Sequence, residues 1–387
     1  MQDAHIGTWW IFVLISISTN MGQTPRFSDY QAVRHFGSLN GLRFFCIAAV
    51  LWHHAPVWTA IDDAPLILTR GFAGVDFFFV LSGFLITTLL MREAAARGRF
   101  SLKGFYWRRF LRIIPVYFLV VTLVSAYYIG VKGETQYLDQ LPFYYLFLSN
   151  FLMSHIPLLT PTWSLAVEEQ YYVVWPLLLM LLPARWLLPV LTVLILLNVV
   201  AVLGWLTPLG IAAFAVGPLE FAMFNTTYAP ILIGSGSAVL LHRPESFAWL
   251  GRIFGQAPAS VLSFLLVLAL LQWLPADLRG WPNLVLHLAM AAALISVVIR
   301  EDNALRPLLA LAPLSRIGEI SYGIYLYHLI ALHIANTGLR AFGFGDFGWA
   351  ILLIYSVISV IIAEVSFRTF ERYFLNLKHK GWGRVSS

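Results

Sequence analysis

Long stretches without charged residues are the feature that most restricts how this chain can fold. Of its 387 residues, 59% are hydrophobic and only 11% are charged. Soluble domains carry about 25% charged residues, so this composition excludes a disordered chain, a secreted disulfide-rich scaffold and an ordinary cytosolic enzyme. It indicates an all-α, polytopic integral membrane protein.

Ten apolar segments are candidate spans, since a membrane-spanning helix needs about 20 mostly apolar residues. The sixth is short and rich in glycine, and a further stretch, 141–153, is too short and is predicted to be re-entrant or interfacial. The ten segments are 42–60, 71–91, 113–131, 163–182, 187–206, 226–241, 259–274, 283–299, 320–337 and 347–367. We expect a bundle of about ten transmembrane helices within one membrane domain, 38–375.

The distribution of basic residues predicts the orientation of this bundle. Ten spans place both ends of the core on the same side of the membrane. If that side is the cytoplasm, all but four of the 25 Lys and Arg residues are cytoplasmic, as the positive-inside rule requires. The four exceptions are Arg70, Lys132, Arg279 and Arg340. This asymmetry explains the net charge of +6 without a nucleic-acid partner, and residues 376–387 become a basic cytoplasmic tail.

The N-terminal extension, 1–37, contains a short apolar run over 6–17. No Lys or Arg precedes this run, so it lacks the positive region of a signal peptide. Either 6–19 forms an extra interfacial helix, or translation begins at Met21; we favour the second.

Ionisable residues inside spans are functional candidates because burying charge in lipid is costly. Arg43 and His54 are eleven residues apart on the first span, so they share one helical face to within about 20°. His54 then lies roughly 16 Å from Arg43, near the middle of the membrane. His53 points about 80° away and is expected to face a neighbouring helix.

Three carboxylates, those of Asp76, Glu168 and Glu169, are predicted to lie in the outer half of the bundle. There they can meet His54, and an imidazole beside a carboxylate is a common general-base arrangement. The alternative is a buried polar network that only holds the helices together. The single Cys46 excludes an internal disulfide, and no spacing matches a zinc site, so we expect no metal.

The connection 92–112 is strongly basic and includes Arg108, Arg109 and Arg112. Arg109 and Arg112 are three residues apart and therefore share a helical face. Guanidinium groups suit phosphate oxygens. The alternatives are plain positive-inside charge and contact with lipid head groups.

Five segments carry a resemblance to a known family. They read SLNGLRFFCIAAVLWHHA, GFAGVDFFFVLSGFLIT, FYWRRFLRIIPVYFL, PTWSLAVEEQYYVVWPLL and ISYGIYLYHLI. In this order they resemble the signature blocks of the membrane-bound acyltransferase-3 family, over roughly 38–375. The resemblance implies a ten-helix bundle that moves an acyl group, commonly acetyl, from cytoplasmic acyl-CoA to a hydroxyl of a sugar or similar acceptor. We expect the stand-alone form, without an appended SGNH-type domain.

The resemblance also implies roles for single residues. The family's arginine and histidine of the first helix fall on Arg43 and His54, and its Arg-x-x-Arg motif, on the CoA side, falls on Arg109 and Arg112. The other blocks supply Asp76, Ser82, Trp163, Ser164, Glu168, Glu169, Tyr322 and His328. One departure is Asn40, where many members have Asp.

The resemblance leads to an expected mechanism with acyl-CoA as co-substrate. Arg108, Arg109 and Arg112, with Ser82, are expected to bind the CoA moiety. His54 takes the proton of the acceptor hydroxyl, or carries the acyl group itself, beside Arg43; Glu168, Glu169 or Asp76 orients its ring. The expected acceptor-binding residues are Trp163, Ser164, Tyr322 and His328, although a helix serine often bonds only its own backbone.

Two other functions are alternatives to the enzyme. A proton-coupled transporter or flippase would employ the buried charges as a relay, but no inverted repeat is evident. A non-catalytic scaffold would not need Arg43 and His54 on one face. For the enzyme we expect a carbohydrate or glycolipid acceptor, the lipid bilayer as surroundings, and the bacterial inner membrane as location. O-antigen, exopolysaccharide, a signal oligosaccharide and a macrolide sugar all stay open as acceptors.

Overall fold

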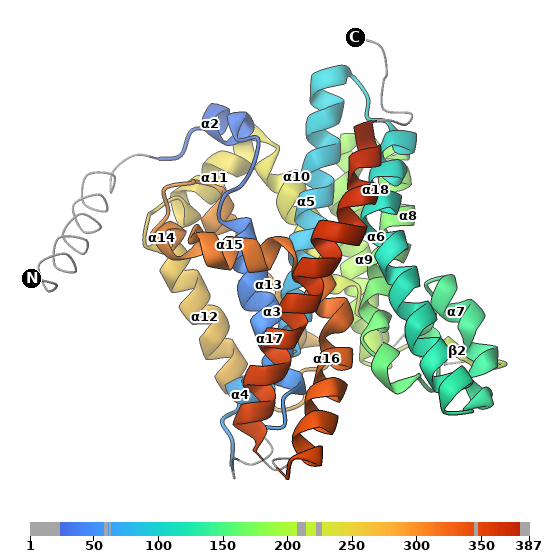
Figure 1. Ribbon diagram of the computed structural model, residues 1–387. Helices are drawn as coiled ribbons and strands as arrows, with labels where there is room; N and C mark the ends of the chain where they lie inside the picture. Colours follow the sequence, from blue (N-terminus) through green and yellow to red (C-terminus); the bar gives the residue numbers. More distant parts are fainter. Residues whose placement is uncertain are drawn as a thin grey trace, which may run out of the picture.

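The structure is a computed structural model that describes residues 24–57, 61, 63–206, 214–221, 227–343 and 347–379. The apolar run 6–17 and Met21 lie outside the described residues, and so does most of the tail 376–387. Figure 1 shows a bundle of long helices, with shorter helices at both ends.

Each of the ten predicted spans coincides with a helix (Figure 1). In chain order these helices are α3 (Leu39–His54), α5 (Ala73–Arg97), α6 (Leu102–Ser125), α8 (Thr162–Leu181), α9 (Leu187–Val202), α10 (Ala229–Leu241), α12 (Ala259–Trp273), α13 (Trp281–Val298), α16 (Ser321–Ala341) and α17 (Gly348–Ser366). The helical interpretation of the apolar segments is therefore confirmed.

The number of membrane crossings is confirmed only in part. In the described part of the chain, five helical segments are long and apolar enough to span a membrane: Ala73–Arg97, Leu102–Val131, Ala184–Val202, Trp281–Val298 and Gly348–Asn376. A sixth is added if α11 (Pro244–Phe254) and α12, which are bent by 78°, form one span. Helices α3 and α10 have only 16 and 13 residues. Ten crossings and cytoplasmic ends remain predictions.

Shorter elements connect these helices. They are α2 (Phe27–Ala32), α4 (Leu66–Thr69), η2 (Ala126–Val131), η3 (Thr135–Gln140), α7 (Leu141–Tyr145), η4 (Ser149–Phe151), η5 (Pro157–Leu159), η6 (Ala184–Trp186), α14 (Arg306–Leu309), α15 (Ala312–Glu319), η8 (Phe367–Glu371), α18 (Arg372–Asn376) and η9 (Leu377–His379). The stretch 141–153 holds α7 and η4 in place of one continuous helix.

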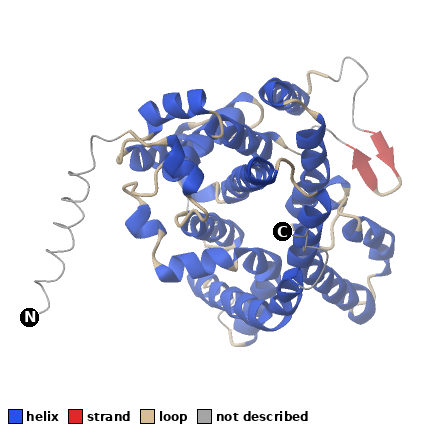
Figure 2. Cartoon of the chain, turned by 90° about the horizontal axis from the view of Figure 1, so that it is seen from above, coloured by secondary structure: helices blue, strands red, loops and turns tan. Residues whose placement is uncertain are grey.

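One feature departs from the all-α prediction. Strands β1 (Phe214–Val216) and β2 (Leu219–Phe221) form an antiparallel hairpin in which Phe214 pairs with Phe221. The hairpin lies at the edge of the bundle when the helices are viewed end-on (Figure 2). Three-residue strands carry too little periodicity for the sequence pattern to distinguish them from a loop.

The connection between α5 and α6 is much shorter than the predicted basic loop 92–112. Helix α5 continues to Arg97 and ends at Gly98, whose φ of 72° is the left-handed conformation that commonly terminates a helix. Helix α6 begins at Leu102, and the hydroxyl of the preceding Ser101 accepts a hydrogen bond of 3.1 Å from the Gly104 N–H. All three predicted phosphate-binding arginines therefore lie on a helix, within about three turns of its start.

Helices α5 and α10 cross at two glycines. A Cβ atom added to Gly83 would lie 1.9 Å from the Ile231 carbonyl oxygen, and one added to Gly234 would lie 2.1 Å from the Val80 carbonyl oxygen. Small residues permit this approach, and close backbone packing is a main source of helix association inside a bilayer. The crossing fixes α5, which carries Ser82.

We expect Gly83→Ala to destabilise the protein by about 1–3 kcal/mol, because the added methyl group forces two backbones apart. The thermal unfolding midpoint of the purified protein in detergent measures this effect. Gly338→Ala is the matched control, since its Cβ would have nothing within 4 Å. Equal midpoints for the two variants would contradict the tight crossing.

Candidate active site

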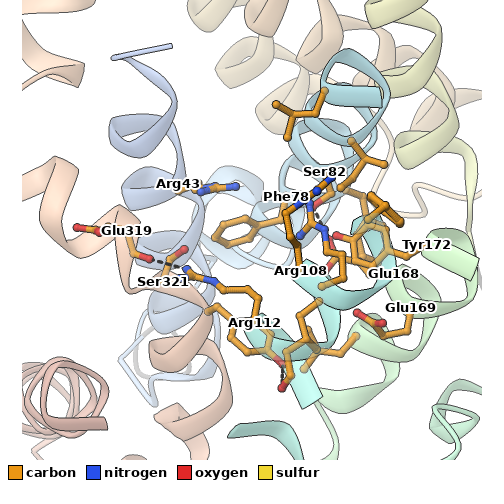
Figure 3. Close-up of a pocket in the computed structure, with 18 of the residues that line it drawn as sticks. Arg43, Phe78, Ser82, Arg108, Arg112, Glu168, Glu169, Tyr172, Glu319 and Ser321 are labelled. Atoms are coloured by element: carbon orange, nitrogen blue, oxygen red, sulfur yellow. Dashed lines mark hydrogen bonds between the residues drawn. The ribbon is translucent and has the colours of Figure 1, made fainter. Parts of the chain in front are cut away.

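A cavity of about 710 Å³ opens where α3, α5, α6, α8 and α16 meet (Figure 3). Its lining is rich in charge for a helical bundle. The charged side chains are Arg43, Glu93, Arg108, Arg109, Arg112, Glu168, Glu169, Glu319 and Lys378. Aromatic rings complete the wall, from Phe78, Phe79, Phe105, Tyr172, Tyr322 and Tyr325. Residues from the first long helix, α3, and from the C-terminal segment therefore line the same cavity.

Some of these charges already have partners. The Arg108 guanidinium donates to the Glu93 carboxylate at 3.1 Å. Glu319 accepts from Arg316 at 2.7 Å through its carboxylate, and from Arg112 at 3.1 Å through its backbone carbonyl oxygen (Figure 3). These bonds orient Arg112 but leave its charge without a carboxylate.

Arg43 and Arg109 make no such bond in the described part of the chain, although the carboxylate of Glu168 acts on both at longer range. The guanidinium carbon of Arg109 lies 4.8 Å from the centre of the Tyr172 ring, a cation–π contact. Within the described residues, no hydrogen bond or ion pair joins Arg43 or Arg109 to a carboxylate. Positive groups gathered around a cavity without paired carboxylates fit an anionic ligand.

Two carboxylates share this cavity with the arginines. The Ser82 hydroxyl donates to the Glu168 carboxylate at 2.6 Å, a short charge-assisted bond between α5 and α8 (Figure 3). Ser82 thus bonds across helices. Glu169 lies beside Glu168 on the cavity wall. From the sequence we expected these glutamates to lie in the outer half of the bundle, where they could meet His54. In the structure they line the same cavity as the arginines of α6.

Asp76 is not brought to this cavity. Its carboxylate lies 3.4 Å from the Nε2 atom of His287 on α13, and both residues are buried. Asp76 and Ser82 are six residues apart on α5, which turns their side chains about 240° from each other. The expectation that three carboxylates gather around one imidazole is wrong for Asp76, because depth alone was considered and rotation was not.

His54 lies beyond the cavity lining and contacts other imidazoles. Its ring centre is 4.8 Å from that of His328 and 5.1 Å from that of His53. Its Nδ1 atom is 3.0 Å from the Val50 carbonyl oxygen, which can only accept, so Nδ1 carries the proton and Nε2 has a free lone pair. Among the described residues, no hydrogen bond joins His54 to Glu168, Glu169 or Asp76, and the ring of His328 lies against that of His54.

His53 faces elsewhere, as predicted from the helical wheel. Its ring centre lies 5.7 Å from that of Phe72, which precedes α5. Arg43 lines the cavity and His54 does not, so their shared face extends from the cavity into the bundle.

The four predicted acceptor-binding residues separate. Tyr322 lines the cavity. Ser164 bonds to the Tyr325 hydroxyl at 2.7 Å, and Trp163 packs against Phe79 at a ring distance of 6.2 Å. His328 is buried, and its Nδ1 atom bonds to the Tyr325 carbonyl oxygen at 2.5 Å. Only Tyr322 of the four lies on the cavity surface.

Tyr325 belongs to the tyrosine-rich stretch 321–327, which we expected to line the acceptor cleft; it lines the cavity, and its ring centre is 5.5 Å from that of His328. Sequence reasoning missed two other cavity residues. Tyr172 lies four residues after Glu168 on the same helical face, which was a usable signal. Lys378 had no comparable local signal. Among the described residues, no group of His, Cys, Asp and Glu side chains has the geometry of a metal site.

Comparisons with known proteins give a consistent result. The family model described as an acyltransferase domain matches residues 36–367. The chain is 28% identical to a peptidoglycan O-acetyltransferase of Listeria monocytogenes, over 94% of this chain and 60% of that protein. It is 24% identical to a putative O-acetyltransferase of Staphylococcus aureus, over 92% of this chain and 59% of that protein.

A third relative extends the comparison. The chain is 28% identical to a putative peptidoglycan O-acetyltransferase of Bacillus subtilis, over 88% of this chain and 55% of that protein. The chain thus spans less than two thirds of the length of these curated relatives. No solved structure matches it.

Proposed function

Because this chain belongs to the acyltransferase-3 family, we propose that it is an integral membrane O-acyltransferase. In this proposal it transfers an acyl group, specifically acetyl, from acyl-CoA to a hydroxyl of a carbohydrate. The observation that carries the proposal is the cavity in which Arg43, Arg109 and Arg112 meet without paired carboxylates. A cavity of this kind accepts a polyanion, and the CoA moiety is one.

The donor is bound through its phosphates at the α6 end of the cavity. Arg109 and Arg112 project from consecutive turns of one helix, and their planar guanidinium groups suit bidentate contacts with phosphate oxygens. Arg108 contributes less, because Glu93 already neutralises it. The pantetheine arm then extends past Arg43 and Tyr325, which lead from the cavity toward the imidazoles.

His54 is the proposed general base. The Val50 carbonyl oxygen holds its Nδ1–H, so Nε2 accepts the proton of the acceptor hydroxyl. As that O–H bond breaks, the oxygen bonds to the thioester carbonyl carbon; the C–S bond then breaks, and the CoA sulfur leaves as a thiol with the proton from the imidazolium. In the alternative route, Nε2 of His54 bonds to the thioester carbonyl carbon and the C–S bond breaks, so that CoA leaves as a thiolate. The acceptor oxygen then bonds to the acyl carbon as the N–C bond breaks, and the hydroxyl proton passes to the thiolate.

His328 lies next to His54, where we had expected a carboxylate. Its Nδ1 is engaged by Tyr325, so its Nε2 is an acceptor as well. Glu168 and Glu169 act in the cavity, where they balance the arginines.

The acceptor class rests on the relatives. Two of them carry peptidoglycan O-acetyltransferase in their names, which favours a hydroxyl of a glycan in the envelope of a bacterium. We extend this to the present chain as a carbohydrate acceptor reached through a multi-pass protein of the bacterial inner membrane.

Release of free CoA tests the activity. Purified protein in nanodiscs is mixed with acetyl-CoA, with and without peptidoglycan fragments or other oligosaccharides, and thiol release and acetylated product are measured. We expect release that depends on the acceptor. A protein that releases no CoA with any acceptor, yet moves a glycan across liposome membranes, would establish the transporter in place of the enzyme.

A further inference from the structure

The segment after α17 returns to the cavity. The α-helix continues through η8, a stretch of π-helix, into α18 and η9, and these last elements pack against α6, which carries the arginines. Phe367 begins this stretch; its ring centre lies 5.8 Å from the Arg112 guanidinium carbon and 4.7 Å from that of Arg316. An extra residue per turn redirects a helix, and here the redirected chain lies along α6.

Lys378 is the residue of this segment that lines the cavity, beside Arg108, Arg109 and Arg112. The other cations near it differ. Arg368 bonds to the Glu364 carboxylate at 2.5 Å, and Arg372 is exposed and is not part of the lining. Lys378 is half-buried, and no ion pair joins it to a carboxylate within the described residues.

The surroundings of Lys378 disfavour its own charge. Burial lowers the pKa of Lys378, and the positive charges of Arg112, Arg109 and Arg108 lower it further. Glu93 pairs with Arg108, but the like charges of Arg109, Arg112 and Lys378 repel one another unless an anion lies between them. Such a cluster is arranged for a ligand with several negative charges and not for internal pairing.

We propose that Lys378 is a donor-binding residue, which holds a phosphate group of the CoA moiety opposite the arginines of α6. This proposal rests on the proposed function. It makes the start of the predicted basic tail a wall of the donor site. An ammonium group acts as a point charge with rotating donors, so it complements the fixed forks of Arg109 and Arg112.

The test compares three variants by titration with CoA in detergent. We expect Lys378→Gln to raise the Kd for CoA by about three- to tenfold, because the contact is partly screened at the mouth. Lys378→Arg keeps the charge and should stay within about twofold of the unaltered protein. Arg372→Gln removes the same charge six residues away and should leave the Kd unchanged. Pantetheine, which lacks the nucleotide phosphates, should bind all of them alike.

The outcomes separate the two proposals. An unchanged Kd for Lys378→Gln, or an equal rise for Lys378→Gln and Arg372→Gln, would overturn the role of Lys378 while CoA binding itself stands. Failure of the unaltered protein to bind CoA would overturn the donor assignment and this inference together. Loss of pantetheine binding in Lys378→Gln would point to a structural role. Identical elution of all variants in size-exclusion chromatography verifies their folding.

Discussion

Replacing His54 with alanine is expected to lower kcat by about a hundred- to ten-thousandfold, the range that a general base contributes. His53→Ala should retain substantial activity, because its ring lies against Phe72 and the ring of His54 lies against His328. His53 and His54 are adjacent and chemically identical, so the comparison of the two variants isolates the effect of where each ring lies.

The measurement is acceptor-dependent release of CoA from acetyl-CoA, with both variants adjusted to equal amounts in the membrane. KM for acetyl-CoA should change little in either variant, since the cavity arginines are untouched. Equal losses of kcat in His53→Ala and His54→Ala would remove His54 from its proposed role. His328→Gln keeps a polar side chain of similar length and should give an intermediate loss.

Arg109→Ala and Arg112→Ala are each expected to raise the apparent Kd for acyl-CoA by about ten- to a hundredfold. This range corresponds to the loss of one charge-assisted hydrogen bond, which contributes about 1.5–3 kcal/mol. Lysine at either position should rescue binding only in part, because it keeps the charge but lacks the planar guanidinium group that can bind two phosphate oxygens at once. Arg108→Ala serves as a comparison. It should raise the Kd for acyl-CoA less than the other two substitutions do, because Glu93 already pairs with Arg108.

Titration of acyl-CoA against each variant, with the acceptor saturating, supplies the constants. Raised salt should reproduce the defects weakly, because a site open at its mouth is partly screened. A large shift in the acceptor constant together with an unchanged acyl-CoA constant would reverse the assignment of this end of the cavity to the donor.

The helices and the register of single residues were predictable, because both depend on local spacing. Apolar length alone located all ten helices. Arg43 and His54 are about three helical turns apart, and Arg109 and Arg112 are slightly less than one turn apart. Each pair was therefore predicted to share a helical face, and each pair lies on one continuous helix in the structure. Apolar length did not determine which helices cross a membrane, because α3 and α10 are short and α8 carries two glutamates.

Partners between distant segments were not predictable. Asp76 meets His287, Ser82 meets Glu168, and His54 meets His328, each across a large interval of sequence. Depth in the membrane restricted these choices, but the rotation of each helix about its axis decided them. Lys378 reached the cavity through π-helical turns, which leave no periodic signal in the sequence.

The glycine crossing between α5 and α10 has a consequence for biogenesis. Ser82 and Glu168 belong to helices that the ribosome completes well before Gly234 emerges, yet the close backbone contact of α5 at Gly83 forms only when α10 is present. The early helices must therefore wait in the insertion machinery or the bilayer with one face of α5 unpaired. Chains arrested before α10 should be recognised by membrane quality control, whereas chains arrested after it should already have α5 locked in place.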